Sequence, residues 1–449
     1  MSKIELNVFQ QSAVYDNILN AQEKTHCECC GKKRESLRFI NEGPYNFVCE
    51  RCYNLDFTWF EGKQIKKSKY GIASRIKISL NELPNTKLKI LLIEPDYYSR
   101  FPPLGLLKLG RYHLDRGDTV KLLRVSHERK LIKNKTRKGS KYTAPFKPDI
   151  VYVTSLFTWS WKPVWDVIRH YRRYYPTATI YLGGIYASIL PDHAAYSGAH
   201  YIHEGLIDEI EDLRPAYELV PEWTSSLFFA TRGCVRRCTF CVVPKLEGRV
   251  KDEKDNIWNQ LVPTHKKAIL WDNNILGADN FESVILSLKS WGREVDFNQG
   301  IDARLITREN ARLLKSLKIK ILHLAYDTKS ARSGVKRGIE YLKEAGFRGK
   351  SLIFYTLYNY RDTPEDFLER LKDLMNWGVV SYPMRFEPLT SLKKNQYVSE
   401  NWNIEILEMI AKARRVLGFM GAFPPYEGLV KKITTAKNLY EAMKLRPTK

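Results

Sequence analysis

The chain has 449 residues and a mass of 52.4 kDa, which is enough for about two to four domains. Its composition, 44% hydrophobic and 27% charged, excludes a disordered or fibrous protein. The 73 Lys and Arg against 50 Asp and Glu leave a net charge of +23. Such a charge is typical of proteins that meet a nucleic acid or an anionic membrane surface, although an organism with a basic proteome would produce the same balance.

The eight cysteines fall into two clusters, one within 27–52 and one within 234–241. Clusters this tight in a large chain indicate metal sites rather than a disulfide framework. No apolar run follows the first lysine, and no stretch approaches the roughly 18 consecutive apolar residues of a membrane span. We therefore expect a soluble, cytoplasmic protein that is kept reduced and has no membrane partner.

Residues 20–60 hold the first cluster as two C-x-x-C pairs. The four expected ligands are Cys27, Cys30, Cys49 and Cys52. Two such pairs at this separation predict a small structural zinc ribbon, closed and tetrahedral, with no position open for catalysis. An auxiliary iron–sulfur cluster would use the same four thiolates and stays an alternative. Cys29 is unassigned, and residues 61–85 follow as a basic connector.

Residues 86–220 alternate apolar, strand-like runs with helical patterns. The expected strands are LKILLIEP, TVKLLRV, DIVYVTSL and TIYLGGI, and the expected helices include PLGLLKLGRYHLDRG and WKPVWDVIRHYRRYY. Alternation of this kind is typical of a doubly wound, Rossmann-like α/β domain with a parallel sheet.

A run of lysine and arginine at 129–141 interrupts this domain after its second strand, where we interpret it as an insertion. Such runs are usually solvated loops. Here the run accompanies a zinc ribbon and a strongly basic chain, a combination that favours contact with a phosphate backbone. The residues we expect to bind nucleic acid are Lys133, Lys135, Arg137 and Lys138.

Residues 221–400 repeat the strand–helix alternation six times. The expected strands are SSLFFAT, AILWD, EVDFNQG, IKILHLAY, SLIFYTLYN and VSYPMRFEPL. After the fifth strand, Thr363, Pro364 and Asp366 form a helix start with a capping box, and Gly378 ends that helix. Six units in succession favour an open, partial (β/α)6 barrel, whose chemistry belongs at the carboxyl ends of the strands.

The segment TRGCVRRCTFCVVP follows the first barrel strand and spaces Cys234, Cys238 and Cys241 as C-x-x-x-C-x-x-C. Three thiolates on one loop can bind three irons of a cubane cluster, and the absence of a fourth nearby cysteine leaves one iron open. The alternatives are three cysteines buried in a core, or a zinc site completed by a distant histidine. The flanking arginines argue against a core.

This loop, with Phe240 before its third cysteine, resembles the cluster-binding loop of the radical S-adenosylmethionine (SAM) superfamily. The resemblance covers residues 224–400 and implies a [4Fe–4S] cluster whose open iron binds SAM. It also implies an external electron donor, and reductive cleavage of SAM to a 5′-deoxyadenosyl radical. The residues that the resemblance assigns to cofactor binding are Phe240, Asp272, Asn273, Asn274, Asp302 and Asp327.

Residues 86–220 in turn resemble the cobalamin-binding-like domain that precedes many such enzymes, through PDIVYVTSL and YLGGIYASILPD among other segments. They lack the D-x-H-x-x-G pattern that supplies a histidine to cobalt. His113 lies within an expected helix, where we expect it to pack or to face solvent. The sequence therefore leaves cobalamin binding open.

Residues 401–449 are expected to be helical and to form either a packing layer or a lid. The leading hypothesis is a radical SAM enzyme that modifies a substrate, with nucleic acid as the candidate. One alternative is a cobalamin-dependent radical SAM methyltransferase acting on a small molecule or peptide. The other is a non-catalytic zinc-ribbon protein that binds nucleic acid. The substrate and the oligomeric state cannot be derived from these patterns.

Overall fold

The computed structural model describes residues 70–133, 142–251, 256–417 and 420–444, and the backbone of four short strands before them. These strands form two antiparallel pairs, β1 (Arg38–Phe39) with β2 (Phe47–Val48) and β3 (Phe57–Phe60) with β4 (Lys63–Lys66). The expected zinc ligands and most of the basic run lie outside the described residues, so both stay predictions. They are Cys27, Cys30, Cys49, Cys52, Lys135, Arg137, Lys138 and the side chain of Lys133.

The chain divides into two compact units. The first comprises Met1–Tyr98 and Arg116–Ile207, and the second comprises Ser99–Asp115 and Asp208–Lys449. Among the described residues, no helix combines the length and the apolar character that a membrane crossing requires.

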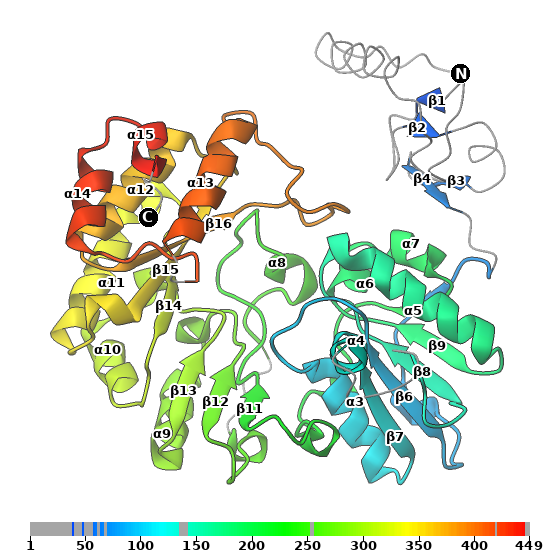
Figure 1. Cartoon of the computed structure of the whole chain (residues 1–449). Coiled ribbons are helices and arrows are strands. Elements are labelled where there is room, and N and C mark those ends of the chain that lie inside the picture. Colours follow the sequence, from blue (N-terminus) through cyan, green and yellow to red (C-terminus); the bar gives the residue numbers. More distant parts are fainter. Residues whose placement is uncertain are drawn as a thin grey trace. The chain divides into compact units, whose positions relative to one another are not determined.

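The first unit contains a six-stranded, fully parallel sheet in the order β5-β10-β9-β8-β6-β7 (Figure 1). Its strands are β5 (Ser74–Ile76), β6 (Lys89–Glu94), β7 (Thr119–Arg124), β8 (Ile150–Val153), β9 (Thr179–Leu182) and β10 (Tyr201–His203). Its helices are α4 (Val125–Lys133), α5 (Trp161–Tyr174), α6 (Ile185–Ile189) and α7 (Pro191–Ala194). The expected doubly wound α/β domain is confirmed, since β6 to β9 are the four strands that the sequence predicts.

The central strands of this sheet consist of apolar runs, which is why the sequence predicts them. In β6, residues 90–93 are completely buried, as expected for a parallel strand covered on both faces. The two strands that the sequence analysis missed, β5 and β10, have three residues each and carry no comparable apolar run. Strand β5 lies within the range assigned to the basic connector.

The second unit contains two three-stranded parallel sheets, β11-β12-β13 and β14-β15-β16. The strands are β11 (Ser225–Phe228), β12 (Lys267–Leu270), β13 (Glu294–Phe297), β14 (Leu322–Ala325), β15 (Leu352–Tyr358) and β16 (Val380–Arg385). Parallel bridges from Glu294 to Lys318 and from Ile301 to Leu324 connect the two sheets. All six expected barrel strands are confirmed. Within the described residues, β11 and β16 are not paired, so the barrel is open and partial.

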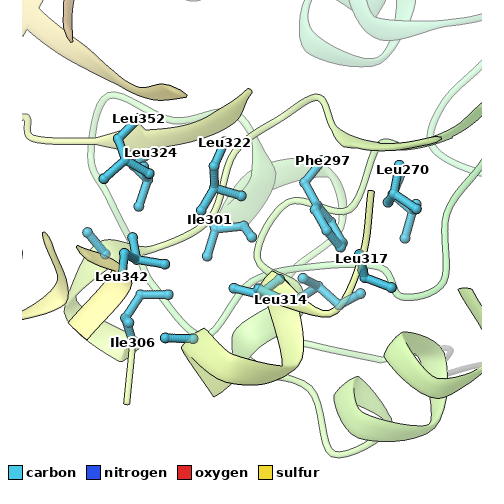
Figure 2. Close-up of a cluster of buried hydrophobic side chains, with 14 of the residues drawn as sticks. Leu270, Phe297, Ile301, Ile306, Leu314, Leu317, Leu322, Leu324, Leu342 and Leu352 are labelled. Carbon is cyan, nitrogen blue, oxygen red and sulfur yellow. The ribbon is translucent and has the colours of Figure 1, made fainter. Parts of the chain in front are cut away.

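Helices cover one face of these strands. They are α9 (Phe281–Trp291), α10 (Arg308–Lys315), α11 (Arg332–Glu344) and α12 (Pro364–Asn376), while the short helix α8 (Val243–Leu246) follows the first strand's loop. Figure 2 shows the resulting core, where Leu322 and Leu324 of β14 lie in one cluster with Leu314 of α10 and Leu342 of α11. Since side chains alternate along a strand, the residues between these point to the opposite, concave face.

Helix α12 begins with the expected capping box, in which Thr363 accepts a hydrogen bond from Asp366 N and the Asp366 side chain accepts one from Thr363 N. Its buried face packs against the C-terminal helices α13 (Ile404–Val416), α14 (Glu427–Thr435) and α15 (Leu439–Met443) in one apolar cluster. Of the two expected roles for the C-terminal segment, the described residues therefore show the packing layer.

Helix α3 (Leu104–Asp115) lies in the sequence between β6 and β7 but belongs to the second unit. Leu104 packs with Leu227 of β11 and Ile269 of β12, which point to the concave face of the barrel. His113 is completely buried in this helix, so of its two expected surroundings, packing or solvent, the structure shows packing.

Candidate active site

The cysteine loop, residues 229–242, leaves the carboxyl end of β11 and is held by backbone contacts. Arg232 and Lys251 exchange two backbone hydrogen bonds of 2.9 and 3.0 Å, and Cys234 N donates to Gly248 O at 3.2 Å. Gly233 has a φ of +77°, and a Cβ at this position would lie 1.9 Å from Arg249 O. Only glycine fits so close an approach, so the turn that places Cys234 is fixed by the backbone.

The three thiols of this loop are free, partly exposed and close enough to influence one another. Burial raises the pKa of the Cys238 and Cys241 thiols, and negative charge on the neighbouring thiols raises both further. Their partial exposure contradicts the alternative of core cysteines. In the part of the chain that is described, no three His, Cys, Asp or Glu side chains converge on one metal ion. Ligands of a cubane cluster instead bind separate irons.

Asp302, in the loop that follows β13, connects the cysteine loop to the end of the third barrel strand. Its carboxylate accepts hydrogen bonds from Arg236 Nε at 2.8 Å and from Arg304 Nε at 2.7 Å. Burial alone would raise the pKa of Asp302, but the hydrogen bonds from the two arginines hold it below its usual value. Arg304 also lowers the pKa of Cys238 by its positive charge, so a guanidinium lies near the thiols.

Asp272, directly after β12, braces the start of the loop. Its buried carboxylate accepts hydrogen bonds from Ala230 N at 3.1 Å, from Thr231 N at 2.6 Å and from Thr231 Oγ1 at 2.9 Å. Burial raises the pKa of Asp272 to about 6, against the opposing effect of these hydrogen bonds. In the structure this side chain faces the loop backbone, and its expected contact with SAM stays a prediction.

The next two residues differ in their surroundings. Asn273 Nδ2 donates to Glu247 Oε2 at 2.9 Å, and the same oxygen accepts from Gly233 N. Asn274 is buried and its Nδ2 lies 3.6 Å from Cys234 Sγ. Its Oδ1 is buried and has no hydrogen-bond partner among the described residues. A buried acceptor without a partner is costly, so this atom fits a donor that is supplied from outside the protein.

The remaining expected residues lie at the same mouth. Asp327, directly after β14, accepts a hydrogen bond from Leu357 N at 3.1 Å, and burial raises its pKa to about 6. Its charge raises the pKa of Cys238 and of Cys241, so it lies near both thiols. Phe240 meets Tyr360 edge to face at 5.6 Å. The structure thus gathers the expected residues from the ends of β11 to β14.

Sequence reasoning missed a polar cluster on the concave face. Asp296 of β13 accepts a hydrogen bond from Lys267 Nζ at 2.7 Å, and its Oδ1 lies 3.7 Å from His323 Nδ1 of β14. Tyr355 of β15 stacks on the His323 ring at 5.6 Å. Burial lowers the pKa of His323, while Asp296 raises it. The available signal was His323 as the one polar residue of β14, and Asp296, which alternates with Glu294, in β13.

Comparisons with known proteins agree with this geometry at the level of the fold. No family model and no curated protein matches the chain. Its fold is similar to that of the radical SAM methyltransferase TsrM from Kitasatospora setae, solved with cobalamin and a [4Fe–4S] cluster bound. The TM-score is 0.53 at 15% identity, over 73% of this chain and 79% of that one.

A second TsrM structure, with tryptophan substrate and the SAM analogue aza-SAM bound, has a TM-score of 0.50 at 14% identity, over 72% of this chain and 77% of that one. Coproporphyrinogen III oxidase (HemN) from Escherichia coli, a radical SAM enzyme, reaches a TM-score of 0.33 at 15% identity, over 49% and 58%. The likeness to TsrM establishes the fold as an α/β chain with a partial barrel of the radical SAM type.

The buried Asp272 carboxylate, which accepts hydrogen bonds from the start of the cysteine loop, generates a prediction about stability. Because its pKa is about 6, the folded protein keeps a proton there that the unfolded chain releases near pH 4. The proton that the folded protein retains on Asp272 stabilises it at low pH. The free energy of unfolding therefore falls as the pH rises from about 4 to about 6 and this proton is lost. Asp272→Asn carries no titrating group, so its melting temperature should rise relative to the unmodified protein across this range.

The measurement is a series of thermal unfolding curves at half-unit pH steps. The exposed Asp279, on the same loop, provides the control variant Asp279→Asn for a general loss of negative charge. A difference between Asp272→Asn and the unmodified protein that stays constant with pH would show that Asp272 titrates as an ordinary carboxyl.

Proposed function

We propose that the protein is a radical SAM enzyme in which Cys234, Cys238 and Cys241 hold a [4Fe–4S] cluster. The observation that carries the proposal is the unpartnered, buried Oδ1 of Asn274 beside the Cys234 thiol, on a loop that presents three free thiols at the carboxyl end of β11. When bound, the cluster and SAM supply a 5′-deoxyadenosyl radical that abstracts hydrogen from a substrate. An external donor supplies the electron.

The residues of the chain have definable parts in this proposal. Asn274 Oδ1 accepts a hydrogen bond from the ammonium of the methionine portion of SAM. Asp327 provides a carboxylate near the thiols for hydroxyl groups of the ribose. Arg236 and Arg304 are fixed by Asp302 and place positive charge beside the three thiols. This charge favours the deprotonated thiolates that bind iron. Phe240 and Tyr360 cover this side of the mouth with aromatic rings.

The cluster assignment predicts the behaviour of Cys234→Ala. After anaerobic reconstitution with iron and sulfide, the unmodified protein should absorb as an iron–sulfur protein and form 5′-deoxyadenosine from SAM under reduction. The variant should lose the product and most of the absorbance, because a ligand of the cluster is missing. Cys29→Ala, which removes a cysteine from the other cluster, is the control and should retain both.

Retention of absorbance and product by Cys234→Ala would contradict the assignment. A third outcome is decisive for the non-catalytic alternative: if the unmodified, reconstituted protein forms no 5′-deoxyadenosine under any reductant, a zinc-ribbon protein that only binds nucleic acid becomes the better description.

The role of Asn274 predicts a loss of SAM affinity. A hydrogen bond to a charged group is worth about 1.5 to 3 kcal/mol, so Asn274→Ala should weaken SAM binding by about tenfold or more. The readout is equilibrium dialysis with labelled SAM at matched iron content, which separates ligand binding from loss of the cluster. Asn273→Ala, whose amide already pairs with Glu247, is the control and should have the smaller effect. Equal losses in both variants would argue against Asn274.

A second candidate function is cobalamin-dependent radical methyltransfer to a small molecule or peptide. The likeness to TsrM covers more residues than the second unit contains, so it extends into the first. At the carboxyl ends of its strands, that unit exposes Tyr98 after β6 and Phe157 after β8, and the Phe157 ring stacks on the half-buried Trp159. Exposed aromatic rings at this edge of a doubly wound sheet suit a large planar ligand.

Cobalamin binding is tested by reconstitution followed by gel filtration. If methyltransfer is the reaction, the protein should retain about one cobalamin per chain and release S-adenosylhomocysteine as a co-product. Phe157→Ala should lower retention, while Tyr174→Ala, an exposed aromatic on α5 of the same unit, is the matched control. Protein that takes up no cobalamin, even when refolded with it, would remove this candidate and leave the first one standing.

A further inference from the structure

Three loops at the mouth of the barrel unit are joined by side-chain contacts into one surface. They are the cysteine loop, the loop after β15 (residues 359–363) and the loop after β16 (residues 386–403). Thr239 Oγ1 lies 2.7 Å from the hydroxyl of Tyr360, and the Tyr360 ring lies 4.6 Å from that of Phe386. Phe386 in turn meets Tyr397 edge to face at 5.5 Å.

Each of these loops carries exposed positive charge. We define the basic rim as Arg237 on the cysteine loop, Arg361 after β15, and Lys393 and Lys394 after β16, all of which are exposed. Within the described residues, Arg237 and Lys393 have no ion-pair partner, and Arg361 contacts only the face of the Tyr360 ring, at 5.5 Å. Side chains of this kind are available to an external anion.

The carboxylates on the same three loops leave Arg237, Arg361 and Lys393 of the rim without a neutralising partner among the described residues. Asp362 pairs with the buried Arg370, and Glu387 lies 3.8 Å from Arg385 and close enough to Lys394 for that charge to lower its pKa. Glu400 is the exposed carboxylate that remains on these loops, against Arg237, Arg361 and Lys393. Next to them, Asp302 is engaged by Arg236 and Arg304. The mouth therefore presents a net positive surface with aromatic rings between its charges.

We propose that the basic rim binds the phosphate backbone of a single-stranded nucleic acid and presents one of its nucleotides to the active site. Regularly spaced phosphates match cations on successive loops, and half-buried rings between cations provide surfaces for stacking bases. In the sequence, Arg237 stands between Cys234 and Cys238, so a nucleic-acid strand bound to Arg237 passes next to the thiols. This inference rests on the proposed function only for the chemical modification of the nucleotide. The binding of the strand does not depend on that function.

The test compares two variants that each lose three positive charges. The rim variant combines Arg361→Gln, Lys393→Gln and Lys394→Gln, which leaves the cysteine loop intact. The control variant combines Lys289→Gln on α9, Arg312→Gln on α10 and Arg337→Gln on α11, all exposed on the covering helices. Full-length, reconstituted protein is titrated against labelled single-stranded RNA and DNA of one sequence, without reductant, at several salt concentrations, with fluorescence anisotropy as the readout.

We expect the rim variant to bind at least about tenfold more weakly at low salt. Its logarithmic salt slope should fall by about 2 units, since each phosphate contact on a single strand contributes about 0.7. The control variant should keep its affinity within about twofold and its slope unchanged. A preference for RNA or for DNA would assign the kind of strand. Equal losses in the two variants, or no binding by the unmodified protein, would overturn the inference.

Polyglutamate of matched charge distinguishes a nucleic acid from an acidic protein. If it displaces the oligonucleotide as well as an unlabelled strand does, the rim is a general anion surface and the inference is overturned. The result is separate from the radical assay, because binding is measured without reduction. Loss of 5′-deoxyadenosine formation would leave rim-dependent binding valid, and absence of such binding would leave the radical chemistry valid.

Discussion

The carboxylate of Asp272 connects the end of β12 to the first residues of the cysteine loop, and the arrangement of the candidate active site depends on this connection. It satisfies the backbone N–H groups of Ala230 and Thr231, which would otherwise be buried without a partner. Gly233 then allows the chain to turn back against the backbone of Arg249. A loop fixed at its base in this way can hold three thiols in place before any metal binds.

Charge around the loop is arranged in two layers. Close to the thiols, arginines are held by carboxylates of the barrel, as Arg236 and Arg304 are by Asp302, so their positions are fixed. Further out, the cations of the basic rim are exposed side chains with few acidic neighbours. Fixed charge suits the deprotonation of thiols, while exposed charge suits a large anionic partner. Part of the net charge of +23 thus has a local explanation on the barrel.

The sequence predicts the barrel well because each unit contains its own signals. In β15 and α12, for example, an apolar strand is followed by the capping box of Thr363 and Asp366 and by a buried face at helical spacing. The cysteine loop is equally local. The pairing of Asp302 with Arg236 joins residues 66 positions apart, and neither end alone predicts the other.

Other features cannot be predicted from the sequence because they depend on tertiary contacts. The apolar stripe of α3 predicts a helix but does not specify which unit that helix covers. His323 is the one polar residue of β14, while Asp296 alternates with Glu294 in β13, and only the alternation of faces brings Asp296 and His323 together on the concave side. The strands β5 and β10, at one end of the first unit's sheet, are too short for any period to emerge.

Electron paramagnetic resonance of the reduced, reconstituted protein, with and without SAM, tests most directly whether this loop holds a cluster with one open iron. We predict a signal from a reduced [4Fe–4S] cluster that changes when SAM is added, because SAM then binds the iron that no cysteine occupies. A signal that is unaffected by saturating SAM, or no cluster signal in protein that contains iron and sulfide, would contradict the assignment of this site.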